Sequence, residues 1–144
     1  MRLDYLKARP DLARHLYGLG RELAKSTLPE DLRELVSVRI SQINKCSFCI
    51  HTHIRKALAA GVTQSKLDLL VSFRELEMFS SREKIALEMA ESMTLVSETH
   101  VPDFIYDAAK AEFSEDELID VVYQISLMNA WNRLSITFRT PLAE

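Results

Sequence analysis

Residues 46–61 read CSFCIHTHIRKALAAG, and this stretch predicts the helix around which the functional part of the chain is organised. The helix is expected to begin at Cys46 or Ser47. It should end at Gly61, because glycine directly after a helix readily adopts the left-handed conformation. A helix turns by about 100° per residue, so steps of three and four residues place Cys46, Cys49 and His53 on one face. These three side chains can therefore act together.

The start of this helix favours a reactive thiolate. Unpaired backbone N–H groups and the helix dipole stabilise negative charge there, and a nearby imidazole can accept a proton. A thiolate reacts with peroxide to give a sulfenic acid, which a neighbouring thiol condenses to a disulfide. Cys49 lies one turn before His53 and is better placed for activation, whereas Cys46 is expected to be the more exposed thiol at the helix start. Cys49 is thus predicted to attack peroxide and Cys46 to resolve, although greater exposure would also suit Cys46 for exchange with an external reductant.

The remaining sequence predicts further helices and no strands. Only three glycines are present, whereas strand-rich folds usually need more for their turns. Ser80 with Glu83, and Ser114 with Glu117, have the spacing of capping boxes. With apolar periodicity, these signals predict helices over residues 10–25, 29–44, 63–70 or 63–73, 80–96 and 102–113, and a long last helix from residue 114.

The last helix is apolar around more than one face, which predicts a central or interfacial position. The chain shows no internal repeat and no linker-like break. We therefore expect one all-helical domain of about seven helices over residues 1–144.

Composition excludes several classes of partner. The 18 basic and 21 acidic residues are interspersed and give a net charge of −3, which offers no basic track for nucleic acid. No apolar run approaches the roughly 20 residues that span a membrane, and the N-terminus lacks a signal-peptide core. Two cysteines three positions apart suit a reducing compartment, so a cytoplasmic protein is expected.

Glu34 extends the cysteine and histidine pattern. A glutamate, eleven residues, Cys-x-x-Cys, three residues and a histidine are met by Glu34, Cys46, Cys49 and His53. In this pattern the chain resembles the alkylhydroperoxidase D-like group of the carboxymuconolactone decarboxylase superfamily. The resemblance continues through residues 54–61, 113–118 and 129–134.

The resemblance implies a helical fold assembled as a homotrimer or homohexamer, and an antioxidant peroxidase activity. It implies that Cys49 attacks a hydroperoxide, that Cys46 resolves, and that Glu34 and His53 relay the proton. A dithiol reductant or a redox partner protein would recycle the enzyme, and no cofactor or metal is expected. Some members carry a histidine just before the second cysteine, where this chain has Phe48, so proton transfer through that position is absent. Phe48 is instead expected to contact the organic part of a substrate.

Other functions remain open at this stage. The pair could serve a redox-sensing or disulfide-exchange module, or Cys46, Cys49 and His53 could bind a structural zinc ion with Glu34 or His51. Lactone decarboxylation is a further alternative, although decarboxylases of the superfamily generally lack the cysteine pair. Trp131, Asn132 and Arg133 are expected to serve packing and helix or subunit contacts rather than chemistry.

Overall fold

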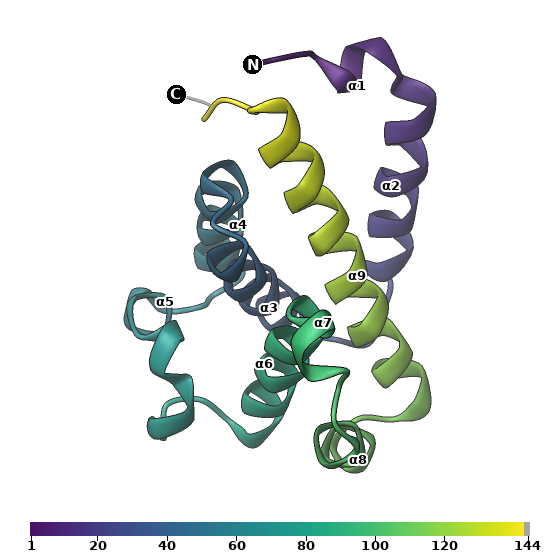
Figure 1. Ribbon diagram of the computed structural model, residues 1–144. Helices are drawn as coiled ribbons and strands as arrows, with labels where there is room; N and C mark the ends of the chain where they lie inside the picture. The colour runs from purple at the N-terminus through teal and green to yellow at the C-terminus, as the bar shows by residue number, and fades with distance from the viewer. Residues whose placement is uncertain (143–144) are drawn as a thin grey trace.

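Helix α9 (Glu115–Phe138) runs through the middle of the molecule, and α2 (Pro10–Leu23), α3 (Glu30–Ile43), α4 (Ser47–Ala59), α6 (Ser81–Thr94) and α8 (Asp103–Glu112) contact it (Figure 1). The computed structural model describes residues 1–142, and within them the chain forms helices and no strand. The predicted all-helical fold and the central position of the last helix are confirmed.

The expected helices form with small changes at their ends. Two four-residue helices, α1 (Tyr5–Ala8) and α7 (Val96–Thr99), were not predicted, and each is a single turn too short to show apolar periodicity. The helix expected from residue 63 divides into α5 (Gln64–Asp68) and the 3₁₀ helix η1 (Leu70–Glu75). Leu70 and Phe73 of η1 are both fully buried, and the backbone departs from helical geometry at Ser72 between them.

The predicted helix caps are present. Ser80 and Glu83 form a capping box at α6, and Ser114 and Glu117 form one at α9. Both carboxylates also make ion pairs, Glu83 with Lys66 at 2.7 Å and Glu117 with Arg82 at 2.5 Å. These contacts tie two helix starts to preceding segments of the chain.

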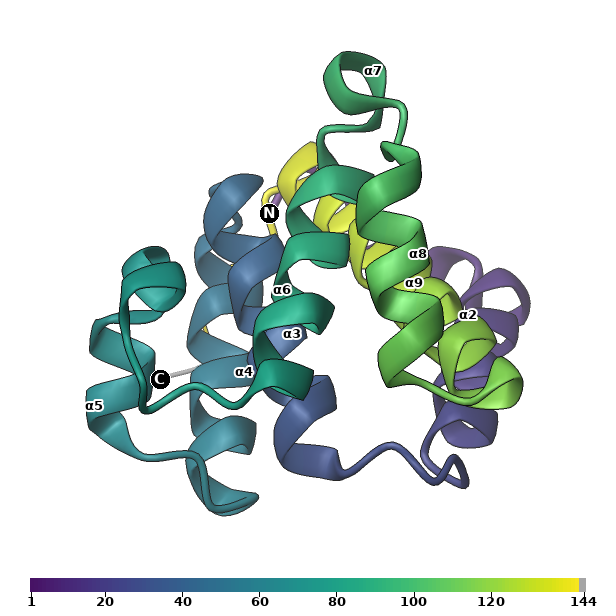
Figure 2. The same ribbon diagram turned by 90° about the horizontal axis from the view of Figure 1, so that it is seen from below.

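Helices α3 and α4 form an antiparallel pair, and α6 packs on the other side of α3 (Figure 2). Much of α3 is buried, including two serines, Ser37 and Ser41, that are 0% exposed. Each serine hydroxyl donates to the carbonyl four residues earlier at 2.8 Å, so burial leaves neither hydroxyl without an acceptor. The small side chains allow α9 to approach α3 closely.

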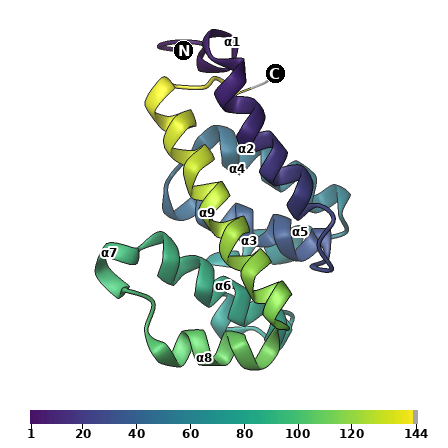
Figure 3. The same cartoon turned by 90° about the vertical axis from the view of Figure 1, so that its right-hand side faces the viewer.

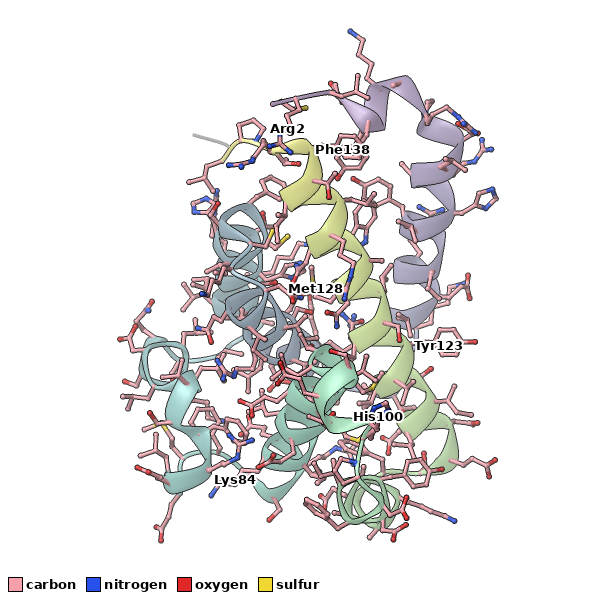
Figure 4. All side chains as sticks on the ribbon, in the orientation of Figure 1. Arg2, Lys84, His100, Tyr123, Met128 and Phe138 are labelled. Atoms are coloured by element: carbon pink, nitrogen blue, oxygen red, sulfur yellow. The ribbon has the colours of Figure 1, made fainter. Side chains whose placement is uncertain are left out.

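The N-terminal segment contacts the C-terminal end of α9. Helix α2 lies along α9 (Figure 3), and the backbone N–H of Arg2 donates to the carbonyl of Phe138 at 2.7 Å. Arg2 and Phe138 meet at the end of α9 in Figure 4, and the ring of Tyr5 stacks on that of Phe138 with centroids 4.8 Å apart. Tyr5 of α1 lines the same cavity as Phe48 and Cys49 in the first turn of α4. None of the helices in residues 1–142 combines the length and apolar character needed to cross a membrane.

Replacing Gly61 or Gly18 by alanine should change the free energy of unfolding in opposite directions. Gly61 ends α4 with φ of 97°, as expected, and nothing lies within 4 Å of an added methyl group, so Gly61→Ala costs backbone strain alone. We expect it to lower the free energy of unfolding by about 1–2 kcal/mol. Gly18, inside α2, has only the Arg21 side chain at 3.7 Å, and Gly18→Ala should raise the free energy of unfolding by about 0.5–1 kcal/mol. Urea unfolding measures both, and equal effects would contradict the assigned conformations.

Candidate active site

A tight turn joins α3 to α4 and sets the position of both cysteines. Lys45 adopts a left-handed conformation with φ of 57°, and the N–H of Cys46 donates to the carbonyl of Ser41 at 3.0 Å. Cys46 is the N-cap of α4, and its sulfur accepts from the N–H of Cys49 at 3.4 Å. The predicted start of this helix is confirmed.

The expectation that Cys46 is the more exposed thiol is wrong. Cys46 is 2% exposed and Cys49 is 3% exposed, and both are free thiols. Cys49 lines the adjoining cavity whereas Cys46 does not. The reason is that the turn folds the start of α4 back onto α3, where both cysteines become part of the hydrophobic core. Cys49 is therefore the thiol that a molecule in the cavity would meet.

His53 and Glu34 meet across the α3 and α4 pair. The Nδ1 atom of His53 lies 2.6 Å from Oε2 of Glu34, and the two side chains are 15% and 10% exposed. A neutral His53 that donates its Nδ1 proton to Glu34 retains Nε2 as a proton acceptor. Both side chains line the cavity beside Cys49. The structure thus brings together the four residues that the sequence pattern selected.

The two thiols differ strongly in acidity. The hydrogen bond from Cys46 lowers the pKa of Cys49 to about 6, against the effect of burial, and Ser135, Asn132 and the charge of His53 lower it further. The same shared proton, together with burial, raises the pKa of Cys46. One negative charge in the pair is therefore held mainly on Cys49.

Sequence reasoning missed two residues of this site. Asn132 and Ser135 lie three positions apart on α9, are 0% and 4% exposed, and help to lower the pKa of Cys49. Asn132 also makes helix contacts of the kind expected for it, with the amide of Asn44 at 2.9 Å and the hydroxyl of Ser41 at 3.2 Å. The available signal was an amide and a hydroxyl at helical spacing within an otherwise apolar stretch, because buried polar groups need partners.

A cavity of about 690 Å³ opens in front of Cys49. Its walls are mainly aromatic and apolar and include Leu16, Tyr17, Phe48, Leu127, Met128 and Trp131. Figure 4 shows Met128 on α9 facing the interior between the helices. The expectation that Phe48 lies beside the cysteine pair, where it can contact a substrate, agrees with this lining.

The zinc alternative finds no support in the geometry. Among residues 1–142, no three side chains of the types His, Cys, Asp and Glu converge so that they could hold a metal ion.

Sequence comparison finds a matching family model and a similar bacterial protein. Residues 10–92 match the profile of the carboxymuconolactone decarboxylase family. The chain is 33% identical over 135 residues to the uncharacterised protein YdfG of Bacillus subtilis (strain 168). The aligned region covers 94% of this chain and 92% of YdfG.

Solved structures share the fold. A protein of unknown function from Agrobacterium tumefaciens, whose description names the antioxidant defence protein AhpD, superposes with a TM-score of 0.94 at 27% identity, over 99% of this chain and 98% of that one. A peroxidase-related protein from Ralstonia eutropha JMP134, described as an alkylhydroperoxidase AhpD core, gives a TM-score of 0.84 at 20% identity, over 96% and 74% of the two chains.

The acidity of Cys49 should be visible in alkylation. The rate of modification by iodoacetamide should rise with pH through about 6, the pKa of Cys49, and then level off, since the thiolate is the nucleophile. Peptide mass analysis should find the first label on Cys49, because the pKa of Cys46 is raised. First labelling on Cys46, or a rate that keeps rising beyond pH 8, would contradict this distribution of charge.

Proposed function

The chain belongs to the carboxymuconolactone decarboxylase family, and from its buried cysteine pair we propose that it is a thiol-dependent peroxidase that reduces organic hydroperoxides. The observation that carries the proposal is the contact between Cys46 and Cys49, together with the His53 and Glu34 pair, which lines the same cavity as Cys49. The lowered pKa of Cys49 supports the same role. Lactone decarboxylation makes no use of such a thiol pair.

The first step is attack by Cys49 on the peroxide. The Cys49 sulfur bonds to the outer oxygen, the O–O bond breaks, and the alkoxide leaves with the electron pair of that bond. His53, after taking the thiol proton, returns a proton to the alkoxide, and Glu34 stabilises the positive charge on the imidazole in between. The products are an alcohol and a sulfenic acid on Cys49.

The second step closes the disulfide. The pKa of Cys46 is raised chiefly by its hydrogen bond to Cys49, and this cause disappears once Cys49 carries a hydroxyl group. Cys46 can then ionise and attack the sulfur of Cys49, which releases hydroxide that becomes water. A dithiol reductant or a redox partner protein returns both thiols and is itself oxidised to a disulfide.

The cavity supports an organic substrate. Pockets of roughly 300–1,000 Å³ hold ligands of drug size, and about 690 Å³ lies well inside that range. Hydrogen peroxide alone would leave nearly all of the apolar wall unused.

Assembly and location belong to the same proposal. We expect a homotrimer or homohexamer, since apolar side chains such as Phe104 at 73%, Tyr123 at 53% and Ile119 at 48% exposure remain available for contact with further copies. A reduced thiol pair fits a cytoplasmic enzyme.

Single-turnover measurements separate the roles of the two cysteines. Cys49→Ser should abolish the reaction with peroxide, whereas Cys46→Ser should consume about one equivalent and leave a trappable sulfenic acid. The parent protein should give an intramolecular Cys46–Cys49 disulfide under the same conditions. A sulfenic acid in Cys49→Ser and none in Cys46→Ser would reverse the two roles.

A sustained cycle distinguishes an enzyme from a redox sensor. The parent protein should consume many equivalents of peroxide when a dithiol is supplied. Disulfide formation without turnover under several dithiols would instead support the redox-sensing or disulfide-exchange module.

His53 and Glu34 should affect rate rather than folding. His53→Gln and Glu34→Gln should slow single-turnover peroxide consumption by roughly 10²- to 10⁴-fold near neutral pH, the usual worth of general acid and base assistance. Higher pH should partly restore the rate, because both changes weaken the positive charge of His53 that helps to lower the pKa of Cys49, and a higher pH restores the thiolate. A useful control is His51→Gln, which changes a histidine of the same helix that does not line the cavity. Unchanged rates in both relay variants would remove the relay from the mechanism.

A further inference from the structure

Two amide side chains of α9 bind the end of α3 just before the cysteine turn. Asn44 is the C-cap of α3 and lies two residues before Cys46. Its side-chain nitrogen donates to Oδ1 of Asn129 and to Oδ1 of Asn132, each at 2.9 Å. An amide nitrogen carries two hydrogens, so both are used in these contacts. The chain is therefore attached to α9 at the point where it turns toward Cys46.

The acceptor on Asn129 is itself held in place. The nitrogen of Asn129 donates to the hydroxyl of Thr94 at 3.1 Å and to the carbonyl of Ile125 at 3.0 Å. Its oxygen also accepts from the guanidinium of Arg133 at 3.2 Å. A guanidinium can only donate and a backbone carbonyl can only accept, so the amide cannot be reversed without losing both contacts. Asn129 thus presents a fixed acceptor to Asn44.

Asn132 connects α9 to the other side of the same turn. Its nitrogen donates to the hydroxyl of Ser41 at 3.2 Å, and the carbonyl of Ser41 accepts from the N–H of Cys46 at 3.0 Å. Asn132 and Ser41 are both 0% exposed, so water does not compete for these contacts. Asn132 therefore contacts two residues in the last turn of α3, and one of them binds the backbone of Cys46 directly.

The turn needs such support because of Lys45. This residue joins Asn44 to Cys46, is exposed, and adopts the left-handed conformation that costs a residue other than glycine backbone strain. A disulfide also requires a narrow geometry, with the two Cβ atoms about 3.5–4.5 Å apart. A turn that relaxed at Lys45 would move Cys46 relative to Cys49, which is held within α4.

We refer to Asn44, Asn129 and Asn132 as the amide cluster. From these contacts we propose that the amide cluster consists of positioning residues that hold Cys46 in place to attack the sulfur of Cys49. In that step Cys46 loses its proton to water and forms the S–S bond, and the group on the Cys49 sulfur leaves with the electron pair of its bond. In the proposed peroxidase cycle, on which this role rests, the leaving group is hydroxide. The cluster acts on disulfide closure rather than on the preceding reaction of Cys49.

One equivalent of methyl methanethiosulfonate separates the two steps without peroxide. The Cys49 thiolate takes the methylthio group and releases methanesulfinate, and Cys46 then attacks the Cys49 sulfur and releases methanethiolate. Mass spectrometry of acid-quenched samples follows both steps, because the adduct appears in the first and disappears in the second. A pH well above the Cys49 pKa of about 6 keeps Cys49 ionised, so that the first rate does not depend on small changes in that pKa.

Asn44→Ala should slow the loss of the adduct by roughly ten- to hundredfold, the usual effect of misplacing a reacting group, and should leave adduct formation nearly unchanged. Gln42→Ala is the control, because it removes an amide from the same turn of α3 that contacts Arg39 instead of the cluster. Both of its rates should match those of the parent protein. A loss of stability alone would not separate the two rates.

Two buried serines give a second, matched comparison. Ser41 and Ser37 are both 0% exposed, and each hydroxyl donates to the carbonyl four residues earlier at 2.8 Å. The hydroxyl of Ser41 accepts from Asn132, whereas that of Ser37 accepts from Gln124. Ser41→Ala should therefore slow the loss of the adduct more than Ser37→Ala does. This pair of variants tests the proposal even if Asn44→Ala fails to fold.

Several results would overturn the proposal. They are an adduct that persists in the parent protein, an adduct lost at the parent rate in Asn44→Ala, and an equal slowing of both steps in that variant. Equal rates in the two serine variants would overturn the role of Asn132. If the adduct behaves as expected but the parent protein reduces no peroxide, the positioning role stands and the proposed function fails.

Discussion

The turn at Lys45 is the constraint on which the site depends, because it folds α4 back against α3 and caps the new helix with a cysteine. An antiparallel pair brings a residue early in α3 opposite one in the middle of α4, and this is how Glu34 meets His53. A carboxylate as buried as Glu34 would be costly without a partner, so the contact supports both the fold and the chemistry. Helix α9 packs against both α3 and α4.

The sizes of two interactions, the helix dipole and the hydrogen bond between the cysteines, indicate which sulfur carries the negative charge. The helix start favours a thiolate on Cys46, an effect worth about 0.3–1 kcal/mol, and the one backbone N–H that reaches this sulfur does so at 3.4 Å. The hydrogen bond from Cys46 is the main cause of the lowered pKa of Cys49, and a hydrogen bond to a charged group contributes about 1.5–3 kcal/mol. This bond outweighs the dipole. The thiolate therefore forms on the second cysteine, inside the first turn, rather than at the cap.

The parts of the site that were predictable from sequence are local. Caps, the stop at Gly61 and the shared face of Cys46, Cys49 and His53 depend on neighbours within a few residues. The burial of Cys46 depends on long-range packing in the core, and the contact between Asn132 of α9 and Ser41 of α3 joins residues 91 positions apart. Helical periodicity shows that a residue faces inward without showing which partner it meets. A polar side chain in an apolar helix therefore indicated a partner without identifying it.

The low pKa of Cys49 also bears on how the proposed cycle is completed. Any group that stabilises the thiolate of Cys49 stabilises the reduced pair relative to the disulfide, in which that charge is absent. A more stable reduced form makes the Cys46–Cys49 disulfide a stronger oxidant, and hence easier for a dithiol to reduce. The same contacts lower the intrinsic nucleophilicity of the sulfur, because nucleophilicity falls with pKa. A pKa of about 6 limits the loss of nucleophilicity and keeps Cys49 mostly ionised at neutral pH. The groups that lower the pKa of Cys49 thus favour both halves of the cycle, ionisation for attack and reduction for recovery.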